Sequence, residues 1–159
     1  MKHRLLLATL ALSAAAAHAD SRDLAVKAEI EAKCRFTSGT LSLDFGKLDP
    51  SIGAAKSQST PLTYECTYGT TPTAIQVGTH PAGSYQGTMK LKGSTGGANK
   101  EFAYRLTWGT SYPPGLGFTL GGGTATRVAV DIGAEVGEGT YSLAQAGAYE
   151  DTVSFTITP

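Results

Sequence analysis

The sequence predicts an all-β protein, an immunoglobulin-like antiparallel β-sandwich closed by one disulfide. Three observations predict it: apolar residues recur at every second position, turn-forming residues collect between these runs, and the chain has 2 cysteines. A helix needs apolar residues three and four positions apart. No window after residue 19 sustains that spacing beside so many glycines and β-branched residues. A closed barrel is the alternative arrangement of the same strands.

Residues 1–19 have the pattern of a secretory signal peptide. Residues 2–4 are basic and residues 5–12 are apolar. Ala17 and Ala19 then place small side chains at the −3 and −1 positions of a cleavage site. The apolar stretch is shorter than the roughly 20 residues that span a bilayer. We therefore expect cleavage before Asp20, export through the periplasm and no stable membrane insertion.

The mature chain, residues 20–159, is expected to form one domain. Removing 19 of 159 residues leaves 140, enough for one sizeable core and too few for two. Lys2 and Arg4 leave with the signal peptide, so 11 of the 13 basic residues remain against 13 carboxylates, a formal charge of −2. Nucleic acid and anionic lipid both require a concentrated basic surface, and this balance argues against either partner.

The two cysteines, Cys34 and Cys66, both lie in the mature chain. An even number of cysteines in an exported chain indicates a disulfide, and two buried free thiols are the alternative. Closing a loop of about 33 residues removes conformational freedom from the unfolded chain, which stabilises the fold by roughly 3 to 4 kcal/mol. The sequence therefore predicts one structural disulfide.

Each predicted strand has an apolar face and a polar one. Over residues 24–34 every second side chain is apolar, whereas Lys27, Glu29 and Glu31 lie on the opposite face. The later strands are predicted, in chain order, at Leu41, Leu43 and Phe45; Leu62, Tyr64, Cys66 and Tyr68; Ile75 and Val77; Met89 and Leu91; Phe102, Tyr104, Leu106 and Trp108; Val128, Val130 and Ile132; and Val153, Phe155 and Ile157. Turn-forming residues separate these runs, and no linker divides them.

The two ends of the mature chain depart from ordinary strands. The first alternating run, residues 24–34, covers 11 residues, about twice the usual strand length of 5 to 6. It is either one long edge strand of the domain's own sheet or a segment with a second task. At the other end, Val153, Phe155 and Ile157 form a strand that Pro159 follows at once. We expect its outer edge to be open to another chain, unless a neighbour comes from within the domain.

The sequence offers no convergent set of catalytic or metal-binding groups, so we expect neither an enzyme nor a cofactor. His80 is the single histidine of the mature chain. A lone histidine supplies neither a metal site nor a base with an orienting partner. We interpret four acidic residues as surface carboxylates, with paired acids for glycoside cleavage as the alternative: Glu135, Glu138, Glu150 and Asp151. The glycine-rich residues 115–117 and 121–123 are interpreted as turns or a flexible connection. Trp108 is expected in the core or on the sheet surface, with a sugar-binding platform as the alternative.

Several stretches of the mature chain together resemble one known family. They are Leu43-Asp44-Phe45-Gly46 with Asp49-Pro50, Leu62-Thr63-Tyr64-Glu65-Cys66-Thr67 with Gly69-Thr70, Phe102-Ala103-Tyr104-Arg105-Leu106, and Ala146-Gly147-Ala148-Tyr149-Glu150-Asp151-Thr152-Val153. Their order, the cysteine spacing and the ending on a Tyr-x-Asp strand resemble the spore coat protein U domain, which is also the fold of archaic, Csu-type chaperone-usher pilins. The likeness covers residues 20–159.

The resemblance implies a domain that lacks its final strand and so exposes an apolar groove. In such pilins a periplasmic chaperone fills the groove, until the N-terminal extension of a neighbouring subunit replaces it at an outer-membrane usher. Backbone hydrogen bonds give an added strand its affinity, and alternate side chains fill pockets. The resemblance implies a donor strand within residues 20–30, with the side chains Leu24, Val26, Ala28 and Ile30. It implies an acceptor groove lined by Val153, Phe155 and Ile157.

The sequence therefore predicts a structural subunit of a bacterial surface fibre, a pilus or fimbrium that serves cell adhesion and biofilm formation. Two alternatives stay open: a secreted coat or matrix protein of the same fold that does not polymerise, and a carbohydrate-binding adhesin module. A tip adhesin would resemble a pilin domain plus a separate binding domain, and the mature chain leaves room for one domain.

Overall fold

The computed structural model describes residues 21–80, 83–118 and 127–159. The expected signal peptide, residues 1–19, lies outside these residues. Contacts divide the chain into two units, Met1–Ile30 and Glu31–Pro159. The described residues form strands and turns but no helix, and hence no helix that is long and apolar enough to cross a membrane.

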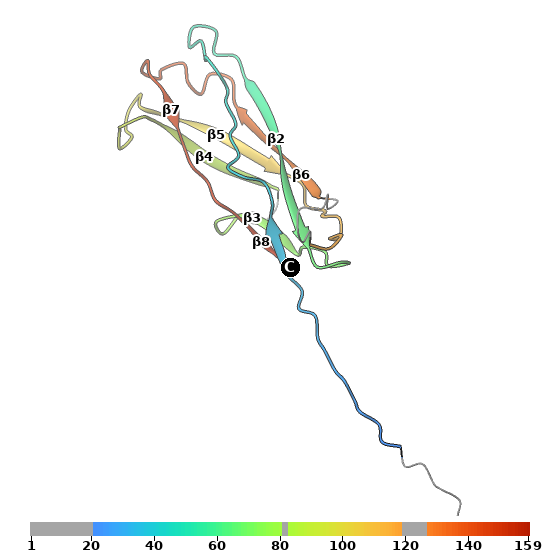
Figure 1. Cartoon of the computed structure of the whole chain (residues 1–159). Helices are drawn as coiled ribbons and strands as arrows, with labels where there is room; N and C mark the ends of the chain where they lie inside the picture. Colours follow the sequence, from blue (N-terminus) through green and yellow to red (C-terminus); the bar gives the residue numbers. More distant parts are fainter. Residues whose placement is uncertain (1–20, 81–82, 119–126) are drawn as a thin grey trace, which may run out of the picture. The chain divides into compact units, whose positions relative to one another are not determined.

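Six strands form one antiparallel sheet, in the order β1-β2-β6-β5-β4-β7 (Figure 1). Their bounds are β1 (Cys34–Phe36), β2 (Lys56–Cys66), β4 (Ser84–Leu91), β5 (Glu101–Trp108), β6 (Val128–Val136) and β7 (Tyr149–Glu150). A second antiparallel sheet consists of β3 (Ala74–Val77) and β8 (Phe155–Thr158). The larger sheet therefore has β1 and β7 as its two edges. The all-β fold with antiparallel sheets that the sequence predicts is confirmed.

The core lies against one face of the larger sheet. In β5 each apolar position is buried and each intervening position is exposed, and β6 follows almost the same alternation. The predicted parity of both strands is therefore confirmed. The most deeply buried large side chains are Tyr64, Cys66, Ile75, Ile132 and Val136, which come from both sheets.

Trp108 connects the two sheets. Its indole Nε1 donates a hydrogen bond to the carbonyl oxygen of Ile75 in β3, at 2.7 Å. Its ring lies edge-on to Phe155 of β8, with 5.5 Å between the ring centroids. Trp108 is buried, and both its hydrogen bond and its ring contact are made inside the domain. The structure therefore assigns it to the core and not to a sugar-binding surface.

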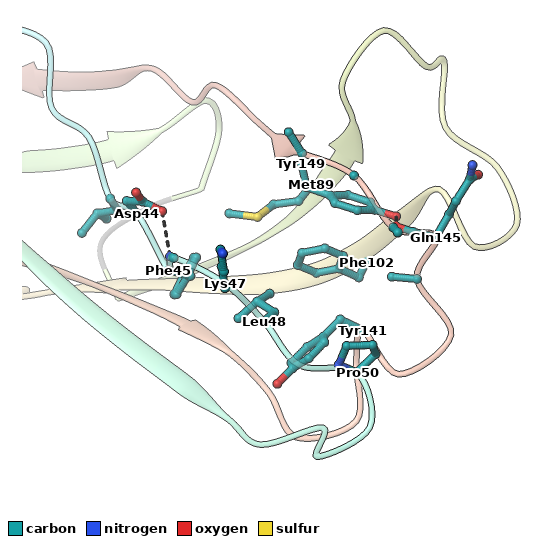
Figure 2. Close-up of a pocket in the computed structure, with 16 residues that line it drawn as sticks. Asp44, Phe45, Lys47, Leu48, Pro50, Met89, Phe102, Tyr141, Gln145 and Tyr149 are labelled. Atoms are coloured by element: carbon teal, nitrogen blue, oxygen red, sulfur yellow. Dashed lines mark hydrogen bonds between the residues drawn. The ribbon is translucent and has the colours of Figure 1, made fainter.

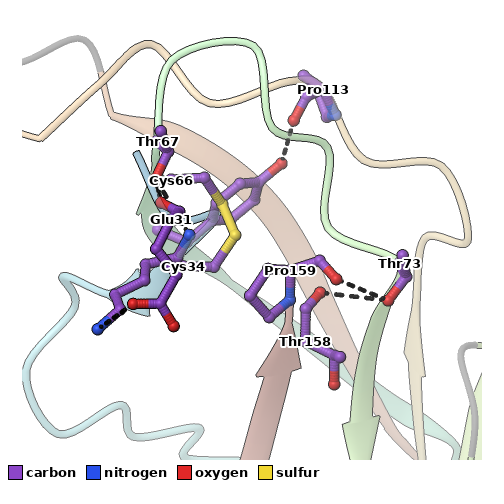
Figure 3. Close-up of a disulfide and its surroundings, with 10 residues drawn as sticks. Glu31, Cys34, Cys66, Thr67, Thr73, Pro113, Thr158 and Pro159 are labelled. Atoms are coloured by element: carbon purple, nitrogen blue, oxygen red, sulfur yellow. Dashed lines mark hydrogen bonds and ion pairs between the residues drawn. A yellow bond between two sulfur atoms is a disulfide. The ribbon is translucent and has the colours of Figure 1, made fainter. Parts of the chain in front are cut away.

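The predicted disulfide is confirmed, and it joins two strands at directly opposed positions. Cys34 of β1 pairs with Cys66 of β2, and the same two residues form the disulfide (Figure 3). The next pair along is Arg35 and Glu65, whose side chains form an ion pair at 3.0 Å between Nη2 and Oε2. Glu65 is only 3% exposed, so its charge depends on such partners. These contacts hold a strand of three residues to the sheet.

Four predicted strands fall short of their alternating runs or are absent, and one of them, β2, ends at Cys66, before the exposed Tyr68. Residues 21–33 form no strand, so the run over residues 24–34 contributes only Cys34 to β1 and is not one long edge strand. Leu41, Leu43 and Phe45 keep the alternation of a strand in their burial, yet no neighbour pairs with them. Val153 likewise precedes β8. Alternation determines which face is apolar, but a strand also needs a partner, which these segments lack within the described residues.

Candidate functional site: an apolar groove between two unpaired edges

The larger sheet curls so that the chain following each of its edge strands borders one open groove. After β1, residues 37–48 belong to no strand, and we call them the N-edge. Between β7 and β8, residues 151–154 also belong to no strand, and we call them the C-edge. Both edges therefore present backbone groups that no strand of the described chain pairs.

Two adjoining cavities make up the groove. The edge cavity, about 410 Å³, has Leu41 and Leu43 of the N-edge on one side and Val153 of the C-edge on the other. Its floor comes from β2, β5 and β6, through Leu62, Tyr104, Leu106 and Ile132. The aromatic cavity, about 540 Å³, continues along the N-edge and shares Leu43, Phe45 and Met89 with the edge cavity.

The side chains that border the groove are half-buried, unlike the core beneath them. Leu41, Leu43, Met89, Val153 and Phe155 all pack against the core but remain partly accessible. Partly exposed apolar surface that is gathered in one place is unfavourable in water and marks a surface for another chain or ligand. The groove therefore favours an apolar occupant.

The aromatic cavity presents ring faces and no free hydroxyl groups. Figure 2 shows Met89, Phe102, Tyr141 and Tyr149 around it, and the Phe102 ring lies 4.8 Å from that of Tyr149, centroid to centroid. The Tyr141 hydroxyl donates to the carbonyl of Ala54 at 2.7 Å, and that of Tyr149 to the carbonyl of Gln145 at 2.8 Å. Backbone carbonyls thus accept from both tyrosine hydroxyls, and the ring faces suit an aliphatic side chain, while Asp44, Lys47 and Gln145 add polar groups to the lining.

The N-edge is anchored at its two ends and unpaired between them. At its start, the N–H of Thr37 donates to the carbonyl of Thr63 in β2, at 2.9 Å. At its end, Lys56 Nζ donates to the carbonyl oxygens of Lys47, at 2.6 Å, and Phe45, at 3.3 Å. The intervening residues 39–44 have no backbone partner among the described residues. These backbone groups are therefore open to pairing with an added strand.

The C-edge is anchored by one side-chain hydrogen bond. The hydroxyl of Tyr104 in β5 donates to Asp151 Oδ2 at 2.7 Å, and the N–H of Thr152 donates to Asp151 Oδ1 at 2.8 Å. Burial of the phenol, and the bond to Asp151 after it, raise the pKa of Tyr104 well above its usual value. A Cβ on Gly87 would overlap the Tyr104 ring, so this glycine makes the arrangement possible. Asp151 thus fixes the point at which the chain leaves β7 for β8.

The structure separates the three residues predicted to line the groove. Val153 and Phe155 border the edge cavity. Ile157, two residues further along β8, does not; it pairs with Ile75 of β3. Sequence reasoning missed Met89 and the N-edge leucines as groove residues, although their alternation was visible. The alternation indicates on which face of a strand these side chains lie. It does not indicate which segments lack a neighbouring strand.

The donor candidates lie in the other unit of the chain, which we describe by itself. Residues 21–30 have no secondary structure and every one is exposed. Leu24 is 87% exposed, and Val26 and Ile30 are each 84% exposed. Large aliphatic side chains are seldom left so exposed in succession, and exposed apolar surface of this kind often marks a site of contact with another surface.

The remaining candidates do not form a second site within the described residues. His80 lies against the Tyr85 ring, with 5.2 Å between the ring centroids, and no group of three metal-ligating side chains is found there. Gly115 packs against Cys66, where a Cβ would overlap, and the backbone of residues 115–117 exchanges hydrogen bonds with residues 66–70, so this stretch is close-packed beside the end of β2 and is not the turn that the sequence predicts. Residues 121–123 lie outside the described residues.

The predicted acidic residues are dispersed over separate elements. Glu135 belongs to β6 and Glu138 to the turn after it. Glu150 of β7 forms an exposed ion pair with Lys92, at 3.6 Å, whereas Asp151 binds Tyr104. These partners give Glu150 a structural role at the surface and Asp151 one at the C-edge.

Comparison with known protein families identifies a family that spans nearly the whole chain. The family model described as Spore Coat Protein U domain matches residues 20–156, which include both the exposed N-terminal segment and the strand-forming domain. Searches of curated proteins and of solved structures returned no match.

Proposed function

Since the chain belongs to the spore coat protein U domain family, we propose that it is a structural subunit of a bacterial surface fibre, joined by donor-strand exchange. One observation carries the proposal: an apolar groove lies between two unpaired edges, in a chain that also carries an exposed run of alternating apolar residues. Residues 20–30 of one subunit would occupy the groove of the next.

A strand in this position would satisfy both edges at once. Its backbone would pair with the N-edge on one side and the C-edge on the other, and every second side chain would enter the groove. Burying Leu24, Val26 and Ile30 would contribute roughly 1.5 to 3 kcal/mol each, on the order of 5 to 9 kcal/mol before the entropic cost of association. This gain is comparable with the whole stability of a typical domain. The free subunit would then be marginal and the assembled one very stable.

The exposed groove also implies that other proteins bind the subunit before it is assembled. Unpaired edges beside apolar surface promote aggregation, so an exported subunit needs its groove covered in transit. In the family resemblance, a periplasmic chaperone covers it and an outer-membrane usher presents the subunit to its neighbour. We include both partners in the proposal, together with a surface location and a structural, non-enzymatic role.

The experiment compares the mature chain with a chain that lacks residues 20–30. The shortened chain keeps the groove, so it should bind a synthetic peptide of residues 21–33, yet it should form no multimers because it has no strand to donate. Multimers are measured as ladders that survive mild detergent and collapse on heating, and as fibres by electron microscopy. A shortened chain that still polymerises head to tail would refute the proposal.

Matched substitutions in the donor segment sharpen the test. Leu24→Ser with Val26→Ser removes two apolar side chains and should abolish multimers, whereas Lys27→Ser with Glu29→Ser changes the opposite face and should preserve them. Equal loss from both pairs would show that composition, and not the apolar face, matters. A full-length chain that stays a monodisperse monomer and binds no peptide would instead support a coat or matrix protein that does not polymerise.

A further inference from the structure

If the groove accepts a strand from a neighbouring subunit, as proposed above, the donor segment of the same chain competes with that strand for the groove. The donor segment is joined directly to β1, which leads into the N-edge. By length alone, residues 24–30 could fold back as a hairpin beside residues 37–43. An intramolecular strand has an effective concentration in the millimolar range, so it would occupy the groove before any neighbour. Assembly therefore requires that self-insertion be prevented.

Thr67 holds the short stretch at which the chain would have to reverse. Its N–H donates to the carbonyl of Lys33 at 2.9 Å, and its hydroxyl accepts from the N–H of Lys33 at 3.0 Å. The same hydroxyl donates to the carbonyl of Glu31 at 3.0 Å (Figure 3). These three bonds continue the pairing of β1 with β2 beyond the disulfide, toward the N-terminus. Residues 31–33 are thereby held extended along the end of β2.

The sequence of this stretch also opposes a reversal. A tight hairpin needs Gly, Asn or Asp at its central positions, because these residues adopt the positive φ values of the favoured turns. Residues 24–33 contain none of them, and no Pro. The disulfide at Cys34 adds a fixed point, since it prevents β1 from leaving β2 to relieve a strained turn. Two independent features, the bonds of Thr67 and the absence of turn-forming residues, thus act on the same three residues.

We propose that Thr67, acting on Glu31 and Lys33, prevents the N-terminal segment from entering the groove of its own domain, so that the occupant is a second molecule. Thr67 is in this sense a specificity residue for the groove. It touches neither cavity and contributes nothing to the affinity of an inserted strand. Loss of the Thr67 hydroxyl should therefore change whether the groove holds the segment of its own chain or that of a second molecule. It should not change the affinity of the groove for an inserted strand.

Two variants of the mature chain test this. Thr67→Val keeps the size of the side chain but removes both hydroxyl bonds. Glu31→Asn with Ala32→Gly keeps Thr67 and supplies the missing turn. Each should raise, at least tenfold, the fraction of monomer that refuses a labelled synthetic peptide of residues 21–33, and each should slow multimer formation by a similar factor. The control is Thr73→Val, which removes a hydroxyl bonded to the carbonyls of Thr158 and Pro159.

Removing residues 20–30 identifies the cause of any loss of peptide binding. In the Thr67→Val chain this deletion should restore peptide uptake, because it removes the self-inserted strand; a merely misfolded domain would stay inactive. If both variants polymerise and take up peptide at the rate of the unmodified chain, the inference is wrong. If the unmodified chain itself neither polymerises nor takes up peptide, the proposed function fails instead, and the two failures are distinct.

Discussion

Replacing Tyr104 with phenylalanine tests whether the C-edge is anchored by a single hydrogen bond. The change removes the hydroxyl that donates to Asp151 at 2.7 Å and leaves the buried ring in place over Gly87. Hydrogen bonds to charged acceptors contribute roughly 1.5 to 3 kcal/mol. Asp151 is exposed, so water replaces the lost donor, and we expect a loss of about 1 to 1.5 kcal/mol in the free energy of unfolding.

The difference in the free energy of unfolding between the unmodified chain and Tyr104→Phe should decrease as the pH rises. The pKa of Tyr104 is raised in the folded domain by burial and by its bond to Asp151, from an ordinary value of 10.0. The folded domain therefore retains a proton that the unfolded chain releases near pH 10. The stability that this proton confers is complete below about pH 10 and is lost as the pH rises further. The stability curves of the unmodified chain and Tyr104→Phe should converge above pH 10.

The assay is urea denaturation of both proteins between pH 7 and pH 11, followed by circular dichroism. Tyr141→Phe is the matched control, because it removes a hydroxyl bonded at 2.7 Å to a backbone carbonyl away from the C-edge. Uptake of the peptide of residues 21–33 should fall in Tyr104→Phe and stay near normal in Tyr141→Phe. A Tyr104→Phe protein of unchanged stability, or one with an unchanged slope above pH 10, would refute the reasoning.

Two further predictions concern the disulfide and the glycine beneath Tyr104. Replacing Cys34 and Cys66 together with serine should lower the free energy of unfolding by roughly 3 to 4 kcal/mol in urea titrations; equal stability would mean that noncovalent contacts suffice to hold β1. Gly87→Ala should cost about 1 to 3 kcal/mol, because the new methyl group displaces the Tyr104 ring. Gly39→Ala meets no atom within 4 Å and should be nearly neutral, so equal melting temperatures for the two variants would contradict the close packing of Gly87.

The sequence predicted the elements that have partners within the domain. The alternation of Phe102, Tyr104, Leu106 and Trp108 gave the buried face of β5, because a paired strand with one solvent-facing side imposes that period. Cys34 and Cys66 gave the disulfide, because both remain in an exported chain. In both cases the partner lies within the same domain, so the residue pattern alone was enough to predict the outcome.

The groove was only partly predictable because it is defined by a missing neighbour. Of the three residues expected to line it, Val153 and Phe155 border the edge cavity, whereas Ile157 does not. Leu41 and Leu43 carry the same alternation as any paired strand, and alternation does not reveal whether a partner exists. The aromatic cavity arises from side chains far apart in sequence, such as Met89 and Tyr149, which only the curled sheet brings together.

The position of the disulfide has a mechanical consequence for a fibre assembled in the proposed way. Tension between subunits would enter each domain through residues 31–33 and reach Cys34 first. The sulfur bridge passes that load directly to Cys66, at the end of the 11-residue strand β2, whose long pairing with β6 lies well inside the sheet. The three-residue strand β1 could then not be peeled away one hydrogen bond at a time. Load would instead be shared along the length of β2 as shear, the direction in which a sheet resists force best.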